Sequence, residues 1–371
     1  MITENVFGCE IRNRHPLGIE SFQKRIILEE IFQKKSNLNN QHPHTMKNIF
    51  ILLLSLTTLI ACKNGKEEST ETQDTAITTD TVPAKSYKLS LAQWSLNKPI
   101  FAGTTDPMDF AKMAKELGFE GLEYVSQLYT NEAVSFSMKD AGLQTILDSL
   151  KARSNQYGMQ NLIIMVDGEG DFSFNDEKVT AQAVENHKKW VDAAQYLGCH
   201  SIRVNLFGES DPEAWVKNSV RSLKAICEYA ATKNVNVIVE NHGGLSSNGQ
   251  LLARVMKEVN MPNCGTLPDF GNFCVKREGG ARWGAPCVEE YDRYKGTEEI
   301  LPWAKGVSAK SYAFDAEGNE TTVDYYKLFE IINNSNFDGF VGIEFEGPEE
   351  DPMAGIKATK ALVEKAAAQS N

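Results

Sequence analysis

From residue 87 onward, short apolar segments alternate with longer amphipathic ones. In the segment 181–198, Ala183, Trp190 and Leu197 recur on one face with the period of an α-helix. Eight short segments have the composition of buried strands: 87–94, 121–125, 161–166, 201–206, 235–240, 264–269, 306–311 and 340–345. This alternation predicts an α/β fold, a parallel (β/α)8 TIM barrel that forms a single domain over residues 87–371. A doubly wound open sheet is the alternative, but no glycine-rich phosphate-binding motif follows the first strand, which argues against a dinucleotide site.

The segment before the barrel has a different character. Residues 46–62 read MKNIFILLLSLTTLIAC, an apolar run that is too short to span a bilayer as a helix but has the layout of a secretory signal. The end of this run, LIAC, resembles the lipobox of bacterial lipoproteins, in which the cysteine, here Cys62, is lipidated and becomes the new N-terminus. We therefore expect a lipoprotein signal peptide at 46–61, a flexible polar tether at 62–86 and a lipid-anchored protein in the cell envelope, on the periplasmic or the outer-surface side. Residues 1–45 precede this better start and are expected not to belong to the native protein. A buried core helix is the alternative for the apolar run.

Charge and cysteine content restrict the partners and the chemistry. The net charge of −12 repels phosphate backbones, so we expect no nucleic-acid partner, and we expect membrane contact only through the lipid anchor. Beyond Cys62 the chain has an odd number of cysteines, which argues against a fully paired disulfide framework. Free buried thiols are expected, and export leaves open a disulfide among the last three. These cysteines are Cys199, Cys227, Cys264, Cys274 and Cys287.

Acidic residues stand at the ends of three predicted strands of the second half. Glu240, Asp269 and Glu344 each follow an apolar strand, and in a TIM barrel the carboxyl ends of all strands meet at one rim. Three carboxylates at one rim repel one another unless a cation lies between them. We therefore predict a divalent metal site, with Mn²⁺ or Mg²⁺ favoured by the oxygen ligands and Zn²⁺ or Co²⁺ possible if an imidazole joins. For a single strand-end acid, an ion pair with a neighbouring Arg or Lys is the alternative.

Other strand ends supply candidates for substrate binding. These are Trp94, Glu123, Asn205 and His242, and Lys310, near the end of the seventh strand, is a candidate catalytic cation. His187 and His200 are expected to lie away from the site. The segment 273–296 is longer than a strand-to-helix link needs, and we expect it to be a loop that covers the substrate with Arg277 as a contact. Trp283 and Trp303 are candidates for stacking on a sugar ring, with packing as the alternative.

A family resemblance covers nearly the whole predicted barrel, from about residue 87 to residue 367. The motifs VIVENHGG, LPDFGNF, VSAKSYAFDAEGNE and GFVGIEFEG, in this order, resemble the xylose isomerase-like TIM barrels known as sugar phosphate isomerases/epimerases, and more narrowly a lipoprotein branch found in Bacteroidetes. The resemblance implies one divalent metal bound by Glu, Asp, His and Glu on strands five to eight. The positions similar to the three acids are Glu240, Asp269 and Glu344.

At two positions the chain departs from the family pattern. Ser308 stands where many members have the strand-seven histidine, and Asn272 stands where a second histidine is frequent. His242 is then the best candidate for an imidazole in the site. Lys310 is either a group that polarises the substrate carbonyl or a salt-bridge partner of Asp269 or Glu344.

The resemblance implies a sugar isomerase or epimerase that acts on a small carbohydrate by metal-assisted proton transfer through an enediolate. Glu240 and Glu344 would exchange the proton, and Lys310 would assist. The same site would also serve a keto-sugar lyase or hydratase. Two other classes stay open: a non-catalytic carbohydrate-binding lipoprotein, and an endonuclease IV-like phosphodiesterase, which needs the histidines and the basic face that this chain lacks.

Overall fold

The computed structural model describes residues 85–348 and 352–369. The predicted signal peptide, Cys62 and residues 1–45 lie outside the described residues, as does the predicted tether except for its last two positions, 85 and 86. Lys85 donates hydrogen bonds from its ammonium to the backbone carbonyls of Asn333 and Ser335. Within the described ranges, no helix is both long enough and apolar enough to cross a membrane.

Eight parallel strands form the centre of the domain, in the spatial order β6-β5-β4-β3-β2-β1-β10-β9. The first and last strands of this order are joined by the parallel bridges Thr266↔Ala304 and Asp269↔Ser308, which close the sheet into a barrel. All eight strands coincide with the predicted segments, so the predicted (β/α)8 TIM barrel is confirmed. The strands are β1 (Leu89–Ala92), β2 (Gly121–Val125), β3 (Gln160–Met165), β4 (Ser201–Val204), β5 (Asn236–Glu240), β6 (Cys264–Leu267), β9 (Val307–Ser311) and β10 (Val341–Phe345).

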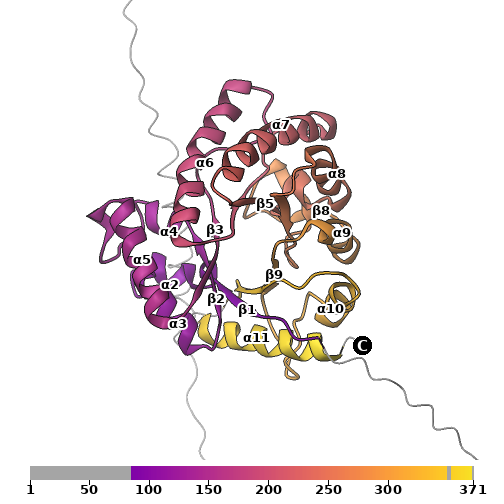
Figure 1. The fold of residues 1–371 in the computed structure, drawn as a ribbon. Coiled ribbons are helices and arrows are strands. Elements are labelled where there is room, and N and C mark those ends of the chain that lie inside the picture. The colour runs from indigo at the N-terminus through magenta and orange to yellow at the C-terminus, as the bar shows by residue number, and fades with distance from the viewer. Residues whose placement is uncertain (1–84, 349–351, 370–371) are drawn as a thin grey trace, which may run out of the picture. The chain divides into compact units, whose positions relative to one another are not determined.

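Helices surround the barrel on its outside (Figure 1). Their apolar faces pack on the strands, as in α6, where Ala183, Trp190 and Leu197 are buried. This helix begins where the Asp176 carboxylate accepts hydrogen bonds from the N–H groups of Lys178 and Val179, and it ends at Gly198 with φ 85°. The helices are α2 (Asn97–Phe101), α3 (Phe110–Glu116), α4 (Gln127–Thr130), α5 (Leu143–Tyr157), α6 (Glu177–Leu197), α7 (Pro212–Ala231), α8 (Gly249–Val259), α9 (Arg293–Ile300), α10 (Tyr325–Asn333) and α11 (Pro352–Gln369).

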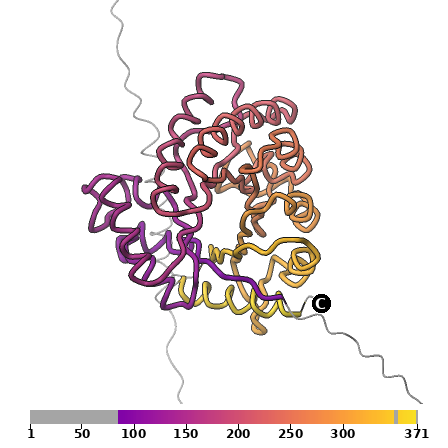
Figure 2. The backbone as a smooth tube through the Cα atoms, in the orientation of Figure 1, coloured from indigo at the N-terminus to yellow at the C-terminus, as the bar shows by residue number. Residues whose placement is uncertain are grey.

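The strands that come first and last along the chain, β1 and β10, are neighbours in the barrel. β1 pairs with β2 on one side and with β10 on the other, with Leu89 opposite Val341. The backbone trace shows this as the indigo start of the barrel running beside its yellow end (Figure 2). The ring of strands is therefore complete only when both ends of the domain are in place.

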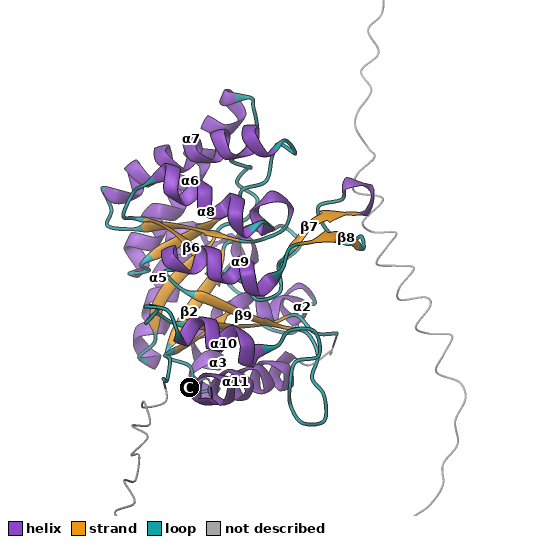
Figure 3. Ribbon diagram, turned by 90° about the vertical axis from the view of Figure 1, so that its right-hand side faces the viewer, coloured by secondary structure: helices purple, strands orange, loops and turns teal. Residues whose placement is uncertain are grey.

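The segment 273–296 is not the open loop that the sequence led us to expect. It forms an antiparallel hairpin of β7 (Cys274–Arg277) and β8 (Cys287–Glu290) before α9 begins. The hairpin projects from one side of the domain, well apart from the barrel strands (Figure 3). A disulfide joins Cys274 to Cys287, so the expectation of free buried thiols is wrong for this pair, because the two cysteines lie on facing strands with their Cα atoms 5.8 Å apart, close enough to bond. Cys199, Cys227 and Cys264 are free and buried, as expected.

Candidate functional site

The carboxyl ends of the strands surround a cavity of about 740 Å³. Each of the eight barrel strands, or the loop that follows it, contributes a side chain to its wall: Trp94, Val125, Asp167, Asn205, His242, Asn272, Lys310 and Glu344. The hairpin adds Arg277, Arg282 and Trp283. The predicted rim residues Trp94, Asn205, His242, Lys310, Glu344 and Arg277 thus lie around one space.

Three carboxylates come together next to this cavity, and Glu344 among them contributes to its wall. Glu240 is the last residue of β5, Asp269 follows β6, and Glu344 lies in β10. Each offers one oxygen, and these oxygens all lie within 4.8 Å of one another. The side chains are nearly inaccessible to solvent, since the residues are 2%, 0% and 4% exposed, respectively. The structure therefore brings together the three acids for which the sequence predicted a metal site.

Lys310 lies against two of these acids and against Glu346. Its Nζ is 3.3 Å from Glu344 Oε1, 3.7 Å from Asp269 Oδ2 and 3.6 Å from Glu346 Oε1. Burial alone would lower the pKa of Lys310, but the carboxylates around it raise the pKa well above its usual range, so the ammonium keeps its charge. Of the two possibilities for Lys310, the salt bridge to Asp269 and Glu344 is present.

Ser308 occupies the position where the family pattern has a histidine, and it links two acids. Its Oγ lies 2.8 Å from Asp269 Oδ2 and 3.0 Å from Glu344 Oε2. A hydroxyl has one proton, so it can donate to only one of the two carboxylates. The other contact becomes a hydrogen bond when Glu344 is protonated and donates to Ser308. Burial raises the pKa of Glu344 to about 8, which agrees with a shared proton at this position.

Glu240 is held from two sides by residues that the sequence did not single out for this role. The Nδ2 group of Asn272 donates to Glu240 Oε1 at 2.9 Å. On the other side, Nε of Arg203 lies 3.0 Å from Glu240 Oε2, as an ion pair whose N–H is not directed at the oxygen. The same guanidinium donates through Nη1 to Asp167 at 2.8 Å. Arg203 thus bridges the carboxyl ends of β3 and β5. Together, Arg203 and Asn272 fix the side chain of Glu240.

The sequence analysis missed both Arg203 and Glu346. Arg203 lies two positions before Asn205 on β4, so its side chain shares the inward face with that predicted rim residue. That alternation was a signal in the sequence. Glu346 lies two positions after Glu344, and the same argument applies to it. Burial acts to raise the pKa of Glu346, but Lys310 and His242 outweigh it, and the pKa is lowered.

His242 is a neutral hydrogen-bonding group in the wall. Its Nδ1 lies 2.7 Å from Asn205 Oδ1, and its ring lies 4.8 Å from the ring of Trp283. Burial, followed by the nearby Arg203 and Lys310, lowers the pKa of His242 to about 3. Because Nδ1 must be the N–H donor to an amide oxygen, Nε2 is the atom left to accept a hydrogen bond.

Glu123 lies inside the barrel rather than on the cavity wall. The residue is 1% exposed and accepts a hydrogen bond from Ser90 Oγ at 2.6 Å. A side chain on Gly342 would place its Cβ 2.4 Å from Glu123 Oε1, so this carboxyl fills the space that the glycine leaves. Burial raises the pKa of Glu123 to about 7.

The remaining aromatic and histidine candidates are divided between the site and other regions. His187, expected to lie outside the site, contributes to the cavity wall from α6, although its Nδ1 is engaged with the Ala183 carbonyl at 2.7 Å. That expectation was wrong because α6 passes beside the cavity. Trp303 lies in the short segment before β9, where its carbonyl approaches Gly265. It therefore belongs to the opposite end of the barrel.

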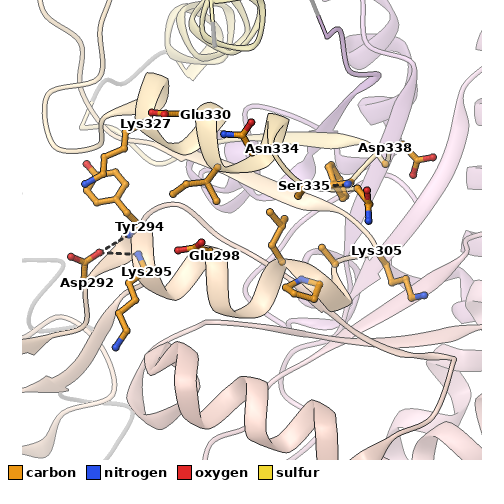
Figure 4. A pocket seen from close by; sticks show the side chains of 17 residues that line it. Asp292, Tyr294, Lys295, Glu298, Lys305, Lys327, Glu330, Asn334, Ser335 and Asp338 are labelled. Carbon is orange, nitrogen blue, oxygen red and sulfur yellow. Dashed lines mark hydrogen bonds between the residues drawn. The ribbon is translucent and has the colours of Figure 1, made fainter. Parts of the chain in front are cut away.

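A second cavity, of about 1030 Å³, lies at that opposite end (Figure 4). It is bounded by α9, α10 and the segments that precede β9 and β10, including Lys305 and Asp338. The labelled side chains of its wall are spread out, and the hydrogen bonds drawn are the helix-capping contacts of Asp292 with the N–H groups of Tyr294 and Lys295. The acid cluster lies at the other end, so we assign the site to the smaller cavity.

The charges of the acid cluster fit a divalent cation. Among the described residues, Asp167, Glu240, Asp269, Glu344 and Glu346 face only two cationic partners, Arg203 and Lys310. Burial raises the pKa of Asp269 to about 6 and also raises the pKa of Glu240, although Lys310 lowers both values and Arg203 lowers that of Glu240. A buried cluster with more acids than cations and three mutually facing oxygen donors is suited to a hard divalent ion.

Comparisons with known proteins agree with this description of the fold. A sequence comparison with curated proteins gives no match. The structure is similar to the IOLI protein with a bound zinc atom (14% identity, TM-score 0.56, 76% of this chain and 99% of that chain). It is also similar to the 3-keto-D-glucoside 4-epimerase YcjR of E. coli (15%, 0.53, 76% and 100%) and to an L-ribulose 3-epimerase (14%, 0.55, 76% and 96%). Such low identities show the fold alone, but the family described as xylose isomerase-like TIM barrel matches residues 111–365 by sequence. The chain therefore belongs to the xylose isomerase-like TIM barrel family.

Proposed function

We propose that the protein is a divalent-metal-dependent sugar epimerase or isomerase that transfers a proton at the carbon beside a carbonyl group. The observation that carries this proposal is the cluster of Glu240, Asp269 and Glu344, whose oxygens lie within 4.8 Å of one another and of which Glu344 lines the cavity. These three residues would hold the cation. A bound divalent ion would act as a Lewis acid on the substrate carbonyl and so make the neighbouring C–H more acidic. Mg²⁺ or Mn²⁺ suits a site with oxygen ligands and no close imidazole better than Zn²⁺ or Co²⁺ does.

The residues of the chain supply the proton chemistry. Glu240, held by Arg203 and Asn272, is the fixed carboxylate that removes a proton from carbon. Glu344 is the second carboxylate of the cluster, and it would exchange a proton with solvent and return it to the enediolate. Return to the same carbon gives an epimer, and return to the neighbouring carbon gives an isomer. The Lys310 ammonium, 3.3 Å from Glu344, supports the negative charge that develops on the substrate oxygen.

The charge of the cavity wall favours an uncharged sugar. The wall contains five acids (Asp167, Glu169, Asp171, Glu344 and Glu346) and four basic residues (Arg203, Arg277, Arg282 and Lys310). Three of these four cations already pair with carboxylates, so a phosphate or carboxylate on the substrate would meet net negative charge. Neutral carbohydrates, rather than sugar phosphates, are the proposed substrate class.

The proposal is tested by turnover of keto-sugars in deuterated water. We expect deuterium at the carbon beside the carbonyl, and we expect Glu240→Gln and Glu344→Gln to abolish its incorporation and to lower the metal content of the purified protein. Glu116→Gln, on the exposed face of α3, is the matched control and should change neither quantity. If the protein binds no divalent ion at millimolar concentration, the proposal is contradicted and a non-catalytic carbohydrate-binding role is favoured. The observation that supports this second role is Ser308 at the position where the family pattern has a histidine.

We also propose that the protein is exported and anchored in the cell envelope through Cys62. The proposal is based on the apolar run at 46–61, the LIAC sequence and the polar tether that follows. Cys62→Ser should release the protein from the membrane fraction of cells that express the native gene. Unprocessed wild-type protein in the cytoplasm would contradict it.

A further inference from the structure

The hairpin β7–β8 is more than a connection between β6 and α9, because its tip reaches three other loops around the cavity. Arg282 pairs with Asp171 in the loop after β3, with Nη2 2.6 Å from Oδ2. The same guanidinium lies 4.2 Å from the centroid of the Phe207 ring, in the loop after β4. The Trp283 ring lies 4.8 Å from His242, which follows β5, and 5.5 Å from Phe207. The tip is therefore held over the mouth of the cavity by contacts far away in sequence.

The strands of the hairpin are largely exposed, and β7 packs against the short segment Gly244–Ser247. All four residues of β8 are exposed, and none of the four residues of β7 is fully buried. An isolated two-stranded hairpin is at best marginally stable in water. The Cys274–Cys287 disulfide links the first residue of β7 to the first residue of β8, and the Arg277 guanidinium donates to the Ala285 carbonyl at 2.9 Å. The covalent bond thus restricts two strands that are largely exposed to solvent.

Trp283 is an aromatic surface without a complete packing partner. Its residue is 47% exposed, and it belongs to the cavity wall. Glu344 of the acid cluster lines the same cavity, as do His242 and Asn205, which are joined by a 2.7 Å hydrogen bond. A cavity of about 740 Å³ is in the range that accommodates ligands larger than one sugar ring. A sugar ring beside Glu344 would leave the rim beside Trp283 for another part of the same ligand.

We propose that the hairpin provides a second sugar-ring subsite, in which Trp283 stacks on the apolar face of a neutral pyranose, and that the Cys274–Cys287 disulfide and the Arg282–Asp171 ion pair are the positioning groups for this ring. The ligand class is a neutral disaccharide or glycoside. This subsite rests on the proposed carbohydrate function, but it requires binding only and no proton transfer.

The binding test uses cellobiose, maltose and sucrose as probes, with D-glucose as the one-ring comparison, titrated calorimetrically into the oxidised full-length protein. We expect at least one disaccharide to bind about tenfold or more tightly than D-glucose. Trp283→Leu should weaken that binding by about tenfold, as expected for the loss of an aromatic contact. Trp303→Phe, at the opposite end of the barrel, is the matched control and should leave it unchanged. Failure of all three disaccharides to bind, or equal binding by Trp283→Leu, overturns the subsite.

The positioning role of the disulfide has a readout that needs no ligand. In Cys274→Ser/Cys287→Ser, we expect amide hydrogen exchange over residues 274–290 to accelerate by tenfold or more, with unchanged exchange in β5 and β10. The affinity for the disaccharide should fall in parallel, and Cys199→Ala should do neither, since that thiol is unbonded. Unchanged exchange in the hairpin contradicts the positioning role. Glu344→Gln should bind the disaccharide without turning it over, which separates the subsite from the proposed reaction. If the wild type binds a disaccharide but incorporates no deuterium, only the proposed reaction is refuted.

Discussion

Replacing Glu123 with glutamine is expected to stabilise the protein at pH 8 but not at pH 4.5. This carboxyl lies inside the barrel, its Oε1 accepts from Ser90, and its Oε2 has no hydrogen-bond partner among the described residues. Burial raises the pKa of Glu123 from 4.5 to about 7. Below pH 4.5 the group is protonated in the folded and the unfolded chain, and it does not oppose folding. As the pH rises from 4.5 to 7, the unfolded chain loses this proton while the folded chain keeps it, so the free energy of unfolding falls.

The size of this change in the free energy of unfolding follows from the shift in the pKa of Glu123. A difference of about 2.5 units at about 1.4 kcal/mol each corresponds to about 3 kcal/mol. The residue is 1% exposed, so solvent screening does not reduce this value much. Glutamine keeps an Oε1 acceptor for Ser90 and stays neutral at every pH. The advantage of Glu123→Gln over the wild type in the free energy of unfolding should therefore grow by about 3 kcal/mol between pH 4.5 and pH 8.

Urea unfolding followed by tryptophan fluorescence, in the presence of EDTA, measures this difference at several pH values. Groups that titrate equally in both proteins cancel when the wild type is subtracted. The exposed Glu116→Gln should give a difference of less than about 0.5 kcal/mol at every pH. A pH-independent advantage for Glu123→Gln would refute the assignment of a buried protonated carboxyl. Metal content should be unchanged in this variant, because Glu123 does not belong to the cluster of Glu240, Asp269 and Glu344.

Three further predictions concern the acid cluster. The pKa values of Glu344 and Asp269 are raised to about 8 and about 6, so a divalent ion must displace protons at lower pH. The affinity for the ion should therefore fall as the pH decreases from 8 to 6, by about tenfold per pH unit for each proton displaced. Calorimetry in two buffers of different ionisation enthalpy counts these protons. Arg203→Met should lower the free energy of unfolding by about 3–5 kcal/mol, because Glu240 loses its ion-pair partner. The same substitution removes a positive charge beside the acids and should raise the affinity for Mn²⁺. If urea unfolding and metal titration show that stability and Mn²⁺ affinity both decrease, the charge argument is contradicted. Ser308→His should shift metal selectivity from Mg²⁺ or Mn²⁺ towards Zn²⁺ or Co²⁺, as measured by competition between the ions, and unaltered selectivity would show that position 308 does not reach the metal.

The sequence predicted the barrel well because strand periodicity and inward alternation are local properties. Glu240, Asp269 and Glu344 could be placed on one rim from their positions at strand ends, since a parallel barrel brings all those ends together. The alternation with Asn205 places Arg203 on the inward face of β4, but only the three-dimensional neighbourhood of Asp167 and Glu240 shows which groups pair with its charge.

The hairpin was missed for a different reason. Residues 278–286 contain turn-forming glycines and charged residues, as loops do, and the pairing of Cys274 with Cys287 depends on which strands face each other. The contacts of Arg282 and Trp283 with Asp171 and His242 join positions far apart in the chain. Such contacts follow from the closed barrel and cannot be read from composition or spacing.

The position of β1 in the ring of strands has a consequence for how the chain is made. Leu89 pairs with Val341, 252 positions later, so during synthesis β1 emerges first, and its second neighbour is made only when almost the whole chain is present. Contacts of such long sequence separation make folding slow, and until they form, β1 keeps an open edge that can pair with other chains. A polypeptide that stops before Val341 therefore cannot close the ring. Premature termination or proteolysis within the last strand should yield insoluble fragments rather than a smaller working domain.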